Sequence, residues 1–228
     1  MSNSFTIVLS LLGGTLPALF WLWFWLKEDK LHPEPKSRIA VAFLAGVASV
    51  FVVLPIERFI FTNITENAGT LTVLLWAATE ELLKFIFVYL VAFRNKEMDE
   101  PLDAVIYMIT GALGFSAIEN AMFLWNLVDA QLFIQSIITG NMRFLGATLL
   151  HTASSATIGI MYGLAFYKSH TVRNLFLYTG IALAIALHTI FNLLIIGRAD
   201  KIFFIFSGIW ILTTILIVLI EKIKTVRS

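Results

Sequence analysis

The chain has 228 residues, of which 59% are hydrophobic and only 14% are charged, and it contains no cysteine. Its mean hydropathy of +0.87 excludes an ordinary soluble domain, in which about a quarter of the residues are charged. The lack of cysteine excludes disulfides, thiolate metal sites and cysteine nucleophiles. A net charge of +1 gives no reason to expect a nucleic-acid partner.

Apolar segments follow one another along the chain, each long enough to cross a hydrocarbon core of about 30 Å. They cover residues 5–26, 38–62, 70–93, 102–126, 142–167, 174–197 and 202–220. The stretch 127–141 is apolar but too short to span the bilayer. It could lie at the membrane surface or form a re-entrant segment, so a bundle of eight membrane segments is the alternative. We therefore predict an all-α polytopic bundle of about seven membrane spans. It forms a single transmembrane domain over residues 1–228.

Basic residues gather in the connections on one side of this predicted bundle. They are Lys27, Lys30, Lys36, Arg38, Arg94, Lys96, Lys168, Arg173, Lys222, Lys224 and Arg227. On the other side the N-terminus and the loop 63–69 hold none, and only Arg198 and Lys201 follow the sixth span. The positive-inside rule therefore predicts a multi-pass protein of the cytoplasmic membrane, with its N-terminus outside and its C-terminus inside.

Ionisable side chains interrupt four of the apolar segments. An ionisable group at the bilayer centre costs about 2.5–3.5 kcal/mol and by default marks a functional site. The candidate site residues in these segments are Glu80, Glu81, Lys84, Glu119, His151, His188 and Asn192. At a rise of 1.5 Å per residue, the carboxylates and imidazoles fall about 10–16 Å below the outer surface. We therefore expect four helices to bring them to one level.

Spacing along the third segment predicts which of its charges pair. Glu80 and Lys84 are four residues apart and share a helix face, so we expect an ion pair between them. Glu81 points about 100° away and is left to face a cavity. Such a pair could be purely structural, as could a single buried histidine or asparagine that bonds a neighbouring helix.

Two non-enzymatic functions compete with a catalytic one. One is a proton- or ion-coupled carrier, whose charged residues would line a path through the membrane. The other is a non-catalytic membrane factor. Here the charges share one level in the outer half of the predicted bundle, whereas the inner half is largely apolar. That distribution favours a hydrolase.

Several protease mechanisms are excluded by missing motifs. The chain has no His-Glu-x-x-His and no Gly-x-Ser-x-Gly elbow, and it has no pair of membrane-buried aspartates. What remains is a Glu/His site, and two models fit it. In a metal model His151, His188 and Glu119 bind zinc while Glu81 is the base for a bound water. In a metal-free model Glu81 and His151 activate water, while His188 and Asn192 stabilise the oxyanion.

The order of these motifs resembles that of a known family. Glu80-Glu81-x-x-Lys84, Gly114-Phe115-x-x-x-Glu119-Asn120, His151 and His188-x-x-x-Asn192 resemble the PrsW family of bacterial intramembrane proteases. The stretch around Glu34-Pro35 and the segment Asp103-Ala-Val-Ile-Tyr107 are similar to that family too, so the resemblance spans about residues 15–197.

The resemblance implies a protease that cuts single-span, membrane-tethered proteins on the extracytoplasmic side, in some members anti-sigma factors. It also implies a metalloprotease, which favours the zinc model. The family is distantly similar to the CAAX prenyl-endopeptidases, for which a glutamate–histidine mechanism is discussed, and a CAAX-type endopeptidase is the alternative enzyme. Asn192 stands where some PrsW members have an aspartate, which brings the last motif closer to the CAAX pattern.

The predicted topology can be tested with single cysteines, since the chain has no native cysteine to react. We expect Thr65→Cys to react with a membrane-impermeant maleimide in intact cells. Glu97→Cys should react only after the membrane is permeabilised. Labelling of position 65 from the inside, or of position 97 only from the outside, would rule this topology out.

Overall fold

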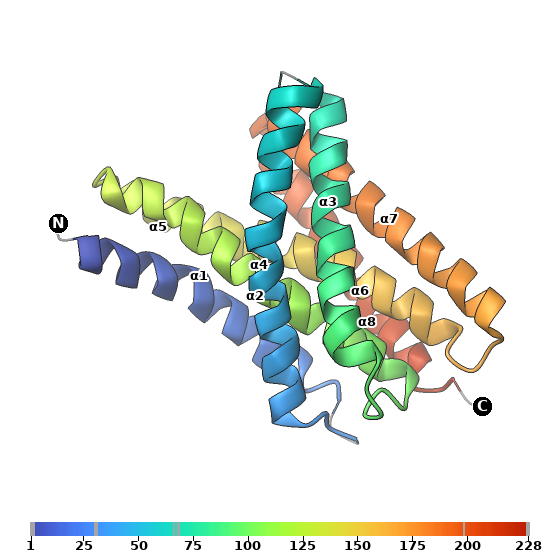
Figure 1. Cartoon of the computed structure of the whole chain (residues 1–228). Helices are drawn as coiled ribbons and strands as arrows, with labels where there is room; N and C mark the ends of the chain where they lie inside the picture. The colour runs from blue at the N-terminus through green and yellow to red at the C-terminus, as the bar shows by residue number, and fades with distance from the viewer. Residues whose placement is uncertain (1–2, 30–31, 66, 68, 198, 227–228) are drawn as a thin grey trace.

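The computed structural model describes residues 3–29, 32–65, 67, 69–197 and 199–226. These residues form helices and no strand, which confirms the all-α prediction (Figure 1). The α-helices are α1 (Asn3–Trp25), α2 (Lys36–Ile60), α3 (Thr70–Val88), α4 (Pro101–Asp129), α5 (Phe133–Met142), α6 (Thr148–Leu164), α7 (His170–Gly197) and α8 (Ile202–Ile223).

Short π-helical turns lengthen or join several of these helices. The turn η1 (Phe61–Thr65) extends α2, and η2 (Tyr89–Phe93) extends α3. The turn η3 (Arg143–Ala147) joins α5 to α6, so that 133–164 is one helix of 32 residues. Among the described residues, six helices are long and apolar enough to cross a membrane. With η2, α3 is the seventh long helix of the described chain, although it carries three charges in its middle.

The ambiguous stretch 127–141 belongs to two long helices and forms no separate membrane segment. The helix α4 continues to Asp129, and α5 begins at Phe133 after a tight turn in which Gln131 has a φ of 59°. Polar residues at this turn interrupt the apolar pattern in the sequence and hide the continuity of α5 with α6. The predicted start of the fifth span at residue 142 is therefore wrong.

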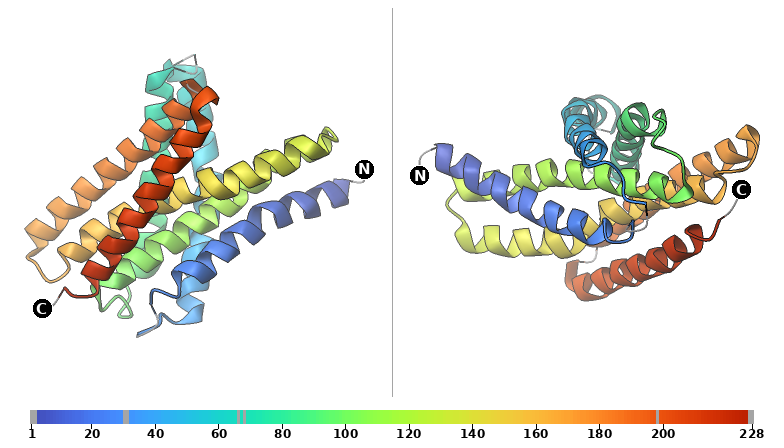
Figure 2. Two further views of the ribbon diagram at one scale, coloured as in Figure 1. Left: turned by 180° about the vertical axis from the view of Figure 1, so that it is seen from behind. Right: turned by 90° about the horizontal axis from the view of Figure 1, so that it is seen from below.

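The helix α4 is the centre of the bundle and packs against α1, α2 and α6 (Figure 2). Every residue from Pro101 to Ala117 is buried. Small residues allow the close approach of neighbouring backbones. Gly46 of α2 lies against the backbone of Gly111, and Gly159 of α6 lies against the backbone of Ala104. These contacts fix the rotation of α2 and α6 about their own axes, and with it the direction of their polar side chains.

The connections divide between two ends of the molecule as the predicted topology requires. The connections after α1, α3 and α6 and the end of α8 lie at one end, whereas the start of α1 and the connections after α2 and α4 lie at the other (Figure 1). The basic residues Lys30, Arg198 and Arg227 lie outside the described residues. Which end faces the cytoplasm stays a prediction.

The contact between α2 and α4 predicts an unusual cost for a single methyl group. A Cβ at position 46 would lie 1.8 Å from the carbonyl oxygen of Gly111, so Gly46→Ala must push two backbones apart. We expect a loss of about 1–3 kcal/mol of stability, measured as a lower unfolding temperature in detergent. Gly208→Ala in α8 is the control, because nothing lies within 4 Å of its Cβ. Equal unfolding temperatures for the two variants would contradict this packing.

Candidate active site

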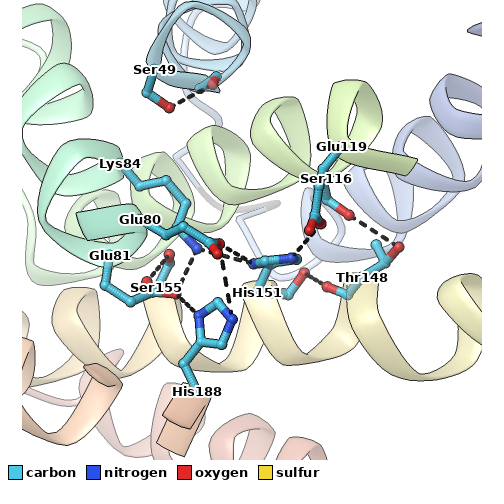
Figure 3. Close-up of polar contacts among 12 residues, drawn as sticks. Ser49, Glu80, Glu81, Lys84, Ser116, Glu119, Thr148, His151, Ser155 and His188 are labelled. Carbon is cyan, nitrogen blue, oxygen red and sulfur yellow. Dashed lines mark hydrogen bonds and ion pairs between the residues drawn. The ribbon is translucent and has the colours of Figure 1, made fainter. Parts of the chain in front are cut away.

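Four helices converge on one group of polar side chains (Figure 3). On α3 the buried positions recur every three or four residues, and three consecutive members of this stripe are charged. The face that turns into the bundle therefore carries charges where a helix ordinarily carries apolar residues. The side chains that meet are Glu80, Glu81 and Lys84 of α3, Glu119 of α4, His151 and Ser155 of α6, and His188 of α7.

Glu80 faces both imidazole rings. Its Oε2 atom lies 3.7 Å from Nδ1 of His151 and 3.9 Å from Nε2 of His188. This oxygen is buried and has no hydrogen-bond partner among the described residues. Since nearly all buried polar atoms in proteins are hydrogen-bonded, an orphaned carboxylate oxygen between two imidazole nitrogens requires an explanation.

The second nitrogen of each ring is held by a different carboxylate. Nδ1 of His188 lies 2.8 Å from Oε1 of Glu81, and Nε2 of His151 lies 2.8 Å from Oε2 of Glu119. An ionised carboxylate only accepts hydrogen bonds, so each of these nitrogens donates its N–H to its partner. In a neutral ring the lone pair is then on the nitrogen that faces Glu80. Carboxylate–histidine pairs of this kind orient metal ligands in many proteins.

Glu81 is enclosed by its own set of donors. Lys84 Nζ donates to Oε1 at 2.5 Å, and Ser155 Oγ donates to Oε2 at 3.1 Å. The prediction of an ion pair between Glu80 and Lys84 is therefore wrong. Lys84 instead pairs with Glu81, three residues away. Spacings of three and four both make neighbours on a helix, and the packing of α3 turns Glu80 toward the histidines instead.

Lys84 also touches the histidine of α6. Its Nζ atom lies 3.1 Å from Nδ1 of His151, and neither Lys84 nor Glu81 has any exposed surface. The lone pair of this nitrogen can serve the ammonium group or a metal ion, but not both at once. Lys84 keeps Glu81 as a partner in either case.

The structure does not gather all the residues of the predicted site. Glu119 lies on the far side of the His151 ring from Glu80, is bonded to Arg143, and does not complete a metal-binding group with both histidines. Asn192 is half-buried, and among the described residues no hydrogen bond joins it to this group. Its predicted role beside His188, to stabilise the oxyanion, stays a prediction.

One residue at the site was missed by the sequence analysis. Arg143 bonds Glu119. It lies near the outer end of a predicted span, where charged residues are common. Its position at the start of an apolar run does not show that its side chain points to Glu119.

The three side chains that face one another fit a metal ion. Their ligand atoms all lie within 4.8 Å of one another. Tetrahedral zinc with bonds of about 2.0–2.2 Å holds its ligand atoms about 3.3–3.5 Å apart, so the two imidazole nitrogens, now 3.7 and 3.9 Å from Oε2 of Glu80, would move a few tenths of an ångström inward to bind it. Two imidazoles and one carboxylate are also a donor set typical of zinc sites that keep a position open. A metal would supply the partner that Glu80 Oε2 lacks.

Comparison with known proteins identifies a family of intramembrane metalloproteases, which agrees with the residues of the site. The family model described as "PrsW family intramembrane metalloprotease" matches residues 34–220. The chain is similar to the proteins named Protease PrsW of Geobacillus kaustophilus (25% identical, covering 82% of this chain and 79% of the relative) and Halalkalibacterium halodurans (22% identical, covering 94% and 95%). That of Bacillus subtilis is 20% identical, covering 84% and 85%. No solved structure matches the chain significantly.

The family model covers most of the chain, and the three relatives named above align along 79%, 95% and 85% of their own length. The long apolar helices agree with a protein that crosses the membrane several times. The buried glutamate and histidines agree with the chemistry that the family's description names. The protein belongs to the PrsW family and is an intramembrane protease.

Proposed function

We propose that the protein cuts peptide bonds at the group formed by Glu80, His151 and His188, and that these three side chains hold a zinc ion. The observation that supports this most strongly is the orphaned Oε2 atom of Glu80, which faces one nitrogen of each ring. This proposal replaces Glu119 by Glu80 in the ligand set expected from the sequence.

The residues around the three ligands have distinct tasks. When bound, a zinc ion would polarise the scissile carbonyl and acidify a water molecule. Glu81 and Glu119 orient the two imidazole rings through the nitrogens that do not face Glu80. Lys84 balances the charge of Glu81. Because both oxygens of Glu81 are already bonded, we propose that it positions His188 and is not the base expected from the sequence.

A metal-free mechanism is the second candidate, and the contact between Lys84 and His151 favours it. There the ammonium group occupies the lone pair that a metal would take. Glu80 would then be the base, since it is the carboxylate that faces both rings. His188 would be left to stabilise the oxyanion, with help from Asn192 only after that side chain has moved.

The substrates of an intramembrane protease are membrane proteins. We propose that this enzyme cuts single-span proteins, anti-sigma factors among them, in the outer half of the cytoplasmic membrane. The distribution of basic connections supports that orientation. The family resemblance supports the substrate class.

The two mechanisms differ in metal content. We expect purified wild-type protein to carry about one zinc ion per chain by elemental analysis. X-ray absorption should show nitrogen and oxygen ligands, since the chain has no cysteine. His151→Ala and His188→Ala should lose the metal and the activity.

His170→Ala is the matched control, because His170 is exposed and bonds Arg173 away from the site. It should keep both metal and activity. Full activity in protein shown to be free of metal would exclude the zinc site and leave the mechanism with Glu80 as base.

A further inference from the structure

Arg143 is a charged residue in the membrane bundle that the proposed function does not yet use. It is the first residue of η3, where the long helix 133–164 loosens into a π-helical turn. Turns of this kind often occur at functional sites. Its side chain is only 14% exposed, so its position needs a specific set of partners.

Those partners lie on a single stretch of α4. Arg143 Nε donates to Oδ1 of Asn120 at 2.5 Å, and Nη2 donates to Oε2 of Glu119 at 2.5 Å. The guanidinium group also stacks over the ring of Phe123, with its central carbon 3.9 Å from the ring centroid. The planar fork of arginine thus meets two acceptors and one aromatic face, a combination that a lysine cannot reproduce.

The bond to Glu119 reaches the site through one shared atom. Oε2 of Glu119 accepts from Arg143 Nη2 and also from His151 Nε2, at 2.5 Å and 2.8 Å. The Glu119 side chain is 23% exposed, so without Arg143 it would be free to turn away from the bundle. His151 would then lose the acceptor that keeps the proton on Nε2 and the lone pair on Nδ1, facing Glu80.

We propose that Arg143 is a positioning residue for metal binding: it holds Glu119 so that His151 presents Nδ1 to the site. The inference rests on the proposed zinc site. Arg143 reaches the ligand His151 only through Glu119. Its loss should therefore weaken metal binding without removing a ligand. Substitution of a residue that orients a metal ligand typically costs 10–100-fold in affinity.

A merely structural role for Arg143 predicts a different pattern. The packing of α4 against α6 has other polar links, because Asn120 and Ser116 both bond Thr148 (Figure 3 shows the link from Ser116). Those bonds remain when Arg143 is replaced. If Arg143 acts through Glu119, the losses of zinc affinity caused by replacing Arg143 and by replacing Glu119 should not add. The second substitution removes an interaction that the first has already broken.

The test is a titration of zinc against a competing chelator, with the unfolding temperature recorded in parallel. We expect Arg143→Gln to bind zinc 10–100-fold more weakly than wild type. Its kcat should fall, while its KM changes little because Arg143 does not touch substrate. The double variant Glu119→Gln/Arg143→Gln should bind zinc as weakly as Glu119→Gln alone. Arg173→Gln, which removes an arginine bonded to the exposed His170, should match wild type.

Arg143→Lys keeps the charge and serves if the glutamine variant fails to fold; we expect an affinity between those of Arg143→Gln and wild type. Wild-type affinity in either variant, or additive losses in the double variant, would overturn the role of Arg143 and leave the zinc site intact. Wild-type protein that binds no zinc would instead refute the proposed site, and the inference with it.

Discussion

A carboxylate buried in a membrane bundle needs a counter-charge or hydrogen-bond donors, since water cannot supply them. The protein meets this requirement in full for Glu81, which bonds Lys84, Ser155 and His188. Arg143 and His151 supply the donors for Glu119. Glu80 is the exception, because one of its oxygens has no hydrogen-bond partner among the described residues. The proposed site follows from that difference: two carboxylates are stabilised by donors and bond one histidine each, and an oxygen of the third is left available for a metal ion or a water molecule.

The geometry of the site depends on tight backbone contacts elsewhere in the bundle. Gly159 brings α6 against the backbone of α4, and Gly46 does the same for α2. These contacts leave little freedom to rotate either helix. On α6, His151 lies two turns before Gly159 and shares its face, so the close approach to α4 also presses the imidazole into the bundle. Packing thus supplies the preorganisation that a metal site or a general base requires.

Periodicity and charge in the sequence predict the helices, the class of protein and most of the side chains that meet, because helix spacing fixes which residues share a face. Spacing does not fix which way that face turns. For this reason the partner of Lys84 is Glu81 instead of Glu80, and it is Glu80, not Glu119, that faces both histidines. Arg143 escaped notice because its role depends on a turn between α5 and α6 that the sequence pattern does not reveal.

The different roles of the two adjacent glutamates are tested most directly by comparing Glu80→Gln with Glu81→Gln. We expect Glu80→Gln to lose cleavage of a single-span substrate, while its unfolding temperature, compared with wild type in metal-free protein, changes little because Oε2 of Glu80 has no hydrogen-bond partner among the described residues. Glu81→Gln leaves Lys84 buried without its counter-ion, a change that costs about 3–5 kcal/mol, so its unfolding temperature should fall sharply. Wild-type cleavage by Glu80→Gln, or equal loss of stability in both variants, would contradict this account.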